Sequence, residues 1–136
     1  MKYRRFGKTD LEVSEVGLGA FPISGMQKRD DGSMFGWTGV EDDESVALIH
    51  RAEELGVNLI DSAEGYGSGH SEIITGKALK GRRDKWIVAT KVTPNRGLEK
   101  DAPDEVAARK RIREACEGSL KRLEMETIDL YQLHAI

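Results

Sequence analysis

Short apolar runs alternate with longer amphipathic segments along this chain of 136 residues. The apolar runs, each of strand length, lie at 13–18, 57–60, 86–90 and 128–133. The amphipathic segments after the first three runs repeat their apolar residues at helical spacing, at 41–55, 71–79 and 101–123. A crossover long enough to hold a helix returns the chain to a parallel strand. The alternation therefore predicts an α/β fold with four parallel strands and three helices packed outside them.

Two of the expected helices carry terminal signals. Acidic residues at 41–44 suit a helix N-terminus, and Gly56 is placed to end that helix. Its apolar stripe consists of Val46, Leu48, Ile49, Ala52 and Leu55. The long helix should begin at Asp101, with Pro103 in its first turn. Its stripe consists of Val106, Ile112, Cys116, Leu120 and Leu123.

The first strand is not followed directly by a helix. Gly17-Leu18-Gly19 leads into a polar, glycine-rich loop that runs to about Val40, longer than the usual connection of about 4–6 residues. An open, doubly wound sheet would place its glycine fingerprint and a helix there, so the sequence favours a barrel segment. A loop of this length is typical of a binding loop or lid. Trp37, with Phe35 nearby, either lines a substrate pocket or packs the loop onto the barrel.

The N-terminus and the composition exclude several classes of protein. Arg4 and Arg5 resemble the pair in an export signal, but no apolar segment of about 7–15 residues follows them. Polar and apolar residues alternate over 9–16, which predicts a short strand or hairpin. With 38% hydrophobic and 33% charged residues and a net charge of -3, we expect no membrane span and no nucleic-acid partner. The single cysteine, Cys116, favours a reducing compartment, and we expect a cytoplasmic protein.

Polar residues stand where the apolar runs end. Asp61 follows the second run, Lys91 follows the third and His134 follows the fourth. Because carboxyl ends of parallel strands meet on one rim, these side chains should lie together, with Tyr66 folding back from the loop after Asp61. Taken alone, Asp61 and Lys91 are more often structural than catalytic. Their coincidence with two further polar residues predicts a proton-handling site.

Each of the four residues has a possible role in carbonyl chemistry. An ammonium beside a phenol stabilises the phenolate, so Lys91 can make Tyr66 a better proton donor. Asp61 can hold Lys91 charged and oriented, and His134 can donate to a carbonyl oxygen. No side chain donates hydride, and carbonyl reduction therefore requires a nicotinamide cofactor.

The order of motifs strengthens this prediction. The motifs are Gly17-Leu18-Gly19-Ala20, then 58–67 with Ser71-Glu72, then Ala89-Thr90-Lys91, then 119–123 leading to 128–134. Over its whole length the chain resembles the aldo-keto reductases. That resemblance implies a (β/α)8 barrel, the TIM-barrel fold. It also implies an enzyme that reduces aldehydes and ketones with NADPH. It also implies a catalytic tetrad of Asp61, Tyr66, Lys91 and His134, with Tyr66 as the general acid. By the same resemblance, the cofactor lies close to Gly19, Ala20, Phe21 and Asp61.

The length of the chain limits what it is expected to do by itself. A barrel of this type needs about 250 residues, so 1–136 would form the N-terminal part of an incomplete barrel domain. We expect weak cofactor binding by this part alone, and exposed strand edges that favour self-association or pairing with the C-terminal half of the barrel. The alternative is a non-catalytic half-barrel module. If the chain is part of a reductase, the expected substrate is a small-molecule carbonyl compound.

Other motifs are assigned no chemistry. Gly65, Gly67 and Gly69 resemble a phosphate loop, but no lysine followed by serine or threonine ends the segment, which favours loop flexibility around Tyr66. His50 and His70 do not have metal-ligand spacing with His134, so no metal site is expected.

Overall fold

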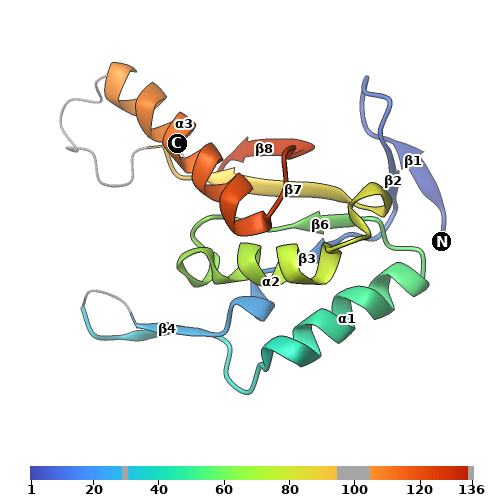
Figure 1. Cartoon of the computed structure of the whole chain (residues 1–136), viewed down its shortest axis with the longest axis horizontal. Helices are drawn as coiled ribbons and strands as arrows, with labels where there is room; N and C mark the ends of the chain where they lie inside the picture. Colours follow the sequence, from blue (N-terminus) through green and yellow to red (C-terminus); the bar gives the residue numbers. More distant parts are fainter. Residues whose placement is uncertain (29–30, 95–104, 135–136) are drawn as a thin grey trace.

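The computed structural model describes residues 1–28, 31–94 and 105–134. Its central sheet consists of parallel strands in the order β3 (Leu18–Gly19), β6 (Leu59–Asp61), β7 (Ile87–Val92) and β8 (Leu130–Leu133). The helices are α1 (Asp42–Glu54), α2 (His70–Leu79) and α3 (Glu105–Leu123) (Figure 1). The prediction of a parallel α/β fold is confirmed. Among the described residues β3 and β8 each pair with one strand only, as expected for an unclosed barrel.

Two antiparallel hairpins lie outside the central sheet, at opposite ends of the molecule in Figure 1. The first pairs β1 (Tyr3–Arg5) with β2 (Glu12–Ser14), which confirms the expected N-terminal hairpin. The second pairs β4 (Met26–Lys28) with β5 (Met34–Gly36). Short 3-10 helices complete the described elements: η1 (Pro22–Ser24), η2 (Tyr66–Gly69) and η3 (Arg83–Lys85).

The expected strand at 13–18 was wrong as one element. Val13 and Ser14 pair with the N-terminal strand, and only Leu18 and Gly19 join the central sheet. The side chain of Ser14 turns the chain between them, because its hydroxyl donates to the carbonyl of Val16 at 2.7 Å. An apolar run does not reveal such a local turn, since side-chain to backbone bonds compete with strand pairing.

The long loop before α1 contains the β4–β5 hairpin, which the sequence analysis did not predict. Gly36 has a φ of 121°, and a Cβ at this position would lie 2.2 Å from the carbonyl oxygen of Gly25. Only glycine allows this close approach. The paired strands are largely exposed and lack a buried apolar face, so hydrophobic periodicity gave no signal for them.

The helix boundaries follow the predicted signals only in part. Acidic residues occupy the first turn of α1, and Gly56 follows its end with a φ of 87°. Leu48 and Leu55 were expected in the buried stripe but are exposed. In α3, Val106 is also exposed, whereas Leu123 is buried. The expected start of this helix at 101–103 lies outside the described residues.

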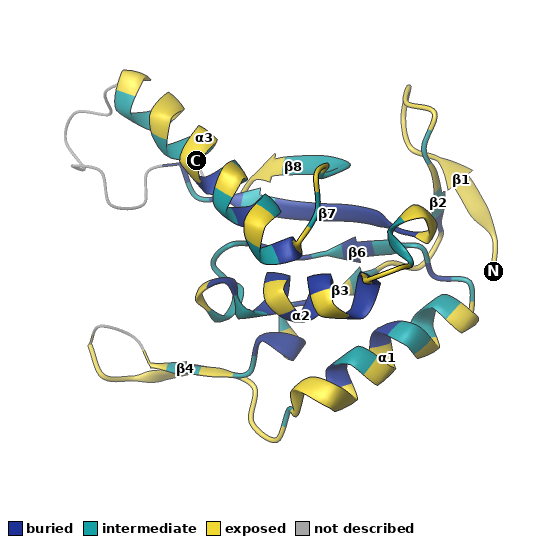
Figure 2. Cartoon of the chain, viewed as in Figure 1, coloured by how far each residue is buried: buried dark blue, intermediate teal, exposed yellow. Residues whose placement is uncertain are grey.

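The core lies between the central sheet and the helices. Strand β7 is buried along almost its entire length, while α1 and α3 each have an exposed side (Figure 2). Ile49, Ile60 and Leu79 are fully buried in this core, and each such side chain contributes about 1.5–3 kcal/mol of hydrophobic stabilisation. At Gly76, α2 approaches the end of α3 so closely that a Cβ would lie 2.5 Å from the carbonyl oxygen of Leu123.

A polar cluster around Glu53 supports the beginning of β7. Trp86 is buried and its indole nitrogen donates to Glu53 at 2.9 Å, while Arg82 and Lys85 form ion pairs with the same carboxylate. Burial acts to raise the pKa of Glu53, but hydrogen bonds from Lys85 and Trp86 outweigh it and hold that pKa below its usual value. Trp86 therefore packs at the N-terminal end of its strand, as expected.

Candidate active site

Strand register brings the predicted polar residues to one rim of the central sheet. Asp61 is the last residue of β6 and pairs in register with Ala89, two residues before Lys91 on β7. Residues two apart on a strand share a face, so Asp61 and Lys91 project to the same side. His134 directly follows β8, and its backbone nitrogen donates to the carbonyl of Val92 at 2.8 Å. This bond and the strand pairing fix where the chain leaves β6, β7 and β8.

Lys91 is the centre of this rim. Its ammonium contacts Asp61 Oδ1 at 2.8 Å, the carbonyl oxygen of Ser62 at 2.8 Å and Tyr66 Oη at 3.3 Å. These three partners match the three donors of an ammonium group. The lysine side chain is 13% exposed, against 44% for Asp61, so the charged nitrogen is held in one place while the carboxylate reaches solvent.

Tyr66 and His134 face each other beside Lys91. The two rings are 5.5 Å apart and nearly perpendicular, at 82°. Tyr66 begins η2, and its backbone nitrogen donates to the carbonyl of Ala63 at 3.0 Å. The following residue, Gly67, has a φ of 66°, and a Cβ there would lie 2.8 Å from the carbonyl oxygen of Ser24. Gly67 therefore serves the tight turn that presents Tyr66.

A cleft of about 390 Å³ opens beside this group. Its lining is largely aromatic and consists of Phe21, Phe35, Gly65, Tyr66, Thr93 and His134. The ring of Phe21 lies 5.0 Å from Tyr66 and 5.3 Å from Phe35. Trp37 is 51% exposed and packs edge-on against Phe21 at 6.5 Å, but it does not line the cleft. The hairpin thus brings aromatic side chains to the rim.

The residues expected near a cofactor have different surroundings. Gly19 is the end of β3, beside Asp61, and apart from its two chain neighbours no residue has an atom within 4 Å of the place where its Cβ would be. This open space suits the close approach of a planar ring. Ala20 is fully buried; its nitrogen donates to the carbonyl of Asp61, and its own carbonyl accepts from Ser71. Ala20 therefore fixes the turn between Gly19 and Phe21.

Sequence reasoning missed three groups at this site. Gln132 donates to Asp61 Oδ1 at 3.4 Å from the same face of the sheet, the carbonyl of Ser62 accepts from Lys91, and Glu64 bonds to Arg111. Gln132 could have been found, because it lies two residues before His134 and in register with Lys91. The partners of Glu64 are distant in the chain and left no pattern.

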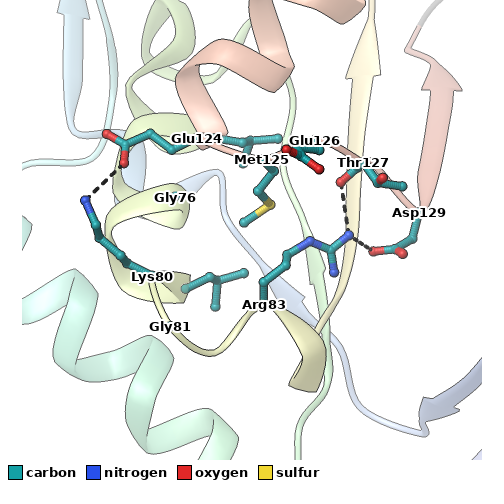
Figure 3. A pocket seen from close by; sticks show the side chains of 11 residues that line it. Gly76, Lys80, Gly81, Arg83, Glu124, Met125, Glu126, Thr127 and Asp129 are labelled. Atoms are coloured by element: carbon teal, nitrogen blue, oxygen red, sulfur yellow. Dashed lines mark hydrogen bonds and ion pairs between the residues drawn. The ribbon is translucent and has the colours of Figure 1, made fainter.

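A second cavity, of about 460 Å³, lies at the opposite end of the strands, between the ends of α2 and α3 (Figure 3). Four of its charged residues form ion pairs, Lys80 with Glu124 and Arg83 with Asp129, and Arg83 also donates to the carbonyl of Thr127. Within 1–28, 31–94 and 105–134, no group of histidine, cysteine or carboxylate side chains could hold a metal ion. Across the same ranges no helix is long and apolar enough to cross a membrane.

Comparisons with known proteins agree with a parallel barrel segment. The family model described as "Aldo/keto reductase family" matches residues 31–136. The chain belongs to this family. It is 40% identical over 136 residues to the aldo-keto reductase YhdN of Bacillus subtilis. This match covers 98% of the chain but 38% of YhdN.

Solved structures show the same partial coverage. The holo form of aldo-keto reductase AKR11C1 from Bacillus halodurans is 35% identical, with a TM-score of 0.74, and the match covers 98% of this chain and 40% of that one. An aldo/keto reductase from Klebsiella pneumoniae in complex with NADP and acetate is 26% identical, with a TM-score of 0.66 over 90% of this chain and 35% of that one. The chain thus spans well under half the length of these relatives.

Proposed function

We propose that this chain is the N-terminal part of an NADPH-dependent oxidoreductase that reduces aldehyde or ketone carbonyls to alcohols. The observation that carries the proposal is the position of Lys91 Nζ, within bonding distance of both Asp61 and Tyr66. Such an arrangement places a phenol beside a fixed positive charge at the edge of an apolar cleft. The relatives from Klebsiella pneumoniae solved with NADP or NADPH support the choice of cofactor.

In this proposal the side chains handle the proton and the charge of the reaction. Bound NADPH supplies a hydride to the carbonyl carbon. Tyr66 gives its proton to the carbonyl oxygen, and Lys91 stabilises the phenolate that remains. Asp61 keeps Lys91 oriented, and His134, across from the Tyr66 ring, donates to the same oxygen.

The cofactor would be held at the end of β3. Gly19, Ala20, Phe21 and Asp61 would contact it, because the space at Gly19 is open and Ala20 fixes the turn. The remaining contacts to the cofactor would come from the C-terminal part of a barrel, because a complete barrel of this type has about 250 residues. The single cysteine supports a cytoplasmic location within this proposal.

A second candidate is a half-barrel module without activity of its own. It is favoured by the coverage of 38% of YhdN, which leaves most of a reductase unmatched by this chain. It differs from the first candidate in predicting no cofactor binding by the 136-residue chain and no reductase activity in any longer product of the gene.

The test is an NADPH titration by fluorescence, run on the purified 136-residue chain and on the gene's longer product, with aldehyde-dependent NADPH oxidation as the second readout. We expect the longer product to bind NADPH and to oxidise it only when an aldehyde is added. Micromolar binding by the short chain would mean that a second copy completes the site. A longer product that neither binds nor oxidises NADPH would overturn the proposed function.

The aromatic cleft predicts which substrates are preferred. We propose that Phe35 contacts the apolar part of the substrate. Trp37 would support the cleft indirectly, by packing against Phe21. Phe35→Ala should raise KM for benzaldehyde about tenfold, because burial of an aromatic face is lost, and leave propanal reduction nearly unchanged. Trp37→Ala should have a smaller effect in the same direction. Met34→Ala, an exposed neighbour on β5, is the matched control. Equal effects on both aldehydes would contradict this assignment.

A further inference from the structure

Glu64 is a largely buried carboxylate two residues before Tyr66. Its side chain is 9% exposed. Oxygen Oε1 accepts from the backbone nitrogen of Thr93 at 3.1 Å and from the guanidinium of Arg111. A carboxylate removed from water requires such partners, and here both are donors, one of them charged. Glu64 therefore joins the loop after β6 to the end of β7 and to helix α3.

The same loop is bonded to β7 through its backbone. The nitrogen of Ser62 donates to Ala89, and that of Glu64 donates to the carbonyl of Lys91 at 3.1 Å. In turn, the ammonium of Lys91 donates to the carbonyl of Ser62. With the bond from Thr93 to the Glu64 side chain, the loop and the strand are tied on both sides of Lys91. This connection joins the strand that carries Lys91 to the loop that carries Tyr66.

We propose that Glu64, held by Arg111, is a positioning residue that fixes Tyr66 over Lys91 and sets the wall of the cleft at Thr93. This inference rests on the proposed function, since it assigns a role within that site. Glu64 touches neither the cleft nor Lys91 Nζ, so it acts through Tyr66 and Thr93. An error of about 1 Å in such a geometry can reduce turnover about 100-fold.

Helix α3 takes part in this arrangement. Arg111 has a side chain that is 21% exposed, and it reaches from the helix to the loop. A charged donor compensates the buried carboxylate, whereas the amide of Thr93 alone would leave the charge incompletely balanced. The proposal therefore assigns α3 a role in the reaction although no residue of the helix lines the cleft.

The experiment uses the gene's longer product and four variants. Glu64→Ala removes both bonds, while Glu64→Gln keeps an oxygen acceptor for Thr93 and Arg111. Arg111→Gln removes only the charged donor. Glu53→Ala is the matched control, because Glu53 is a similarly shielded, multiply bonded carboxylate at the opposite end of β7. The readouts are kcat, KM for NADPH, thermal unfolding and amide hydrogen exchange at Thr93.

We expect Glu64→Ala to lower kcat at least about tenfold, with KM for NADPH changed less than about twofold and with faster exchange at Thr93. Glu64→Gln should restore kcat to within about threefold of the wild type, and Arg111→Gln should fall between the two. Glu53→Ala should lower the unfolding temperature and keep kcat. If Glu64→Ala does not fold, Arg111→Gln serves the same comparison.

A Glu64→Ala variant with fast Thr93 exchange but wild-type kcat would overturn the inference, as would equal loss of kcat in Glu53→Ala. The proposed function fails differently. In that case the wild-type protein itself would show no aldehyde-dependent oxidation of NADPH, while hydrogen exchange would still report whether Glu64 orders the loop.

Discussion

Tyr66→Phe in the gene's longer product is expected to lower carbonyl reduction by about 100- to 10,000-fold while NADPH affinity stays within about twofold. The substitution removes one oxygen and keeps the ring that packs against Phe21 and His134. Lys91 loses a hydrogen-bond partner but retains Asp61 and the carbonyl of Ser62, so its position should not change. The loss would therefore report the missing proton donor. Stopped-flow measurement of NADPH oxidation checks it.

The control for this variant is Tyr3→Phe. The hydroxyl of Tyr3 is also hydrogen-bonded, since it donates to the carbonyl of Gly56 at 2.8 Å, but Tyr3 lies in the N-terminal hairpin away from the rim. Loss of this hydrogen bond in Tyr3→Phe should lower the free energy of unfolding by about 1 kcal/mol and leave turnover unchanged. Near-normal turnover in Tyr66→Phe would rule out Tyr66 as the acid, whatever its effect on folding.

The second large effect concerns folding stability. Arg122→Met should lower the free energy of unfolding by about 3–5 kcal/mol, because it leaves the carboxylate of Glu72 buried without its charged partner. Glu72 is fully buried on α2, accepting from Arg122 at 2.7 Å and from the hydroxyl of Thr90 at 2.6 Å. Urea unfolding of the gene's longer product measures the change.

Lys121→Met is the matched control for Arg122→Met. It removes the same charge from the adjacent, exposed position of α3 and should change stability by less than about 0.5 kcal/mol. Adding Glu72→Gln to Arg122→Met should recover about 1 kcal/mol or more, because the unpaired charge is then gone. A stability loss below about 1 kcal/mol in Arg122→Met would show that the ion pair contributes little.

Most of the central sheet could be predicted from the sequence because its strands come from short, mainly apolar runs, and β7 is buried along almost its entire length. The runs that became β6, β7 and β8 consist mainly of apolar residues, and polar residues follow where they reach the rim. That signal is local, so it placed Asp61, Lys91 and His134 on one edge before any contact was known. The β4–β5 hairpin carries little buried surface, and its pairing was missed for that reason.

The resemblance to reductases added the expected roles, and the geometry brought the four residues together. The resemblance did not identify Gln132 or the hydrogen bonds of Glu64. Gln132 follows from strand alternation, since it shares a face with Lys91 on the neighbouring strand. Glu64 could not be assigned in the same way, because its acidic side chain inside a glycine-rich loop is typical of an exposed position.

The sequence alone determined the alternation of strands and helices, the parallel sheet and the presence of polar residues at its rim. These features arise from periodicity and from residues near one another in the chain. The tertiary structure alone decided that Lys91 bonds to Ser62, Asp61 and Tyr66, and that the largely buried Glu64 lies beside Arg111, 47 positions away. Such pairs depend on how helices pack over the sheet, and no local pattern encodes which distant charge will neutralise a buried one.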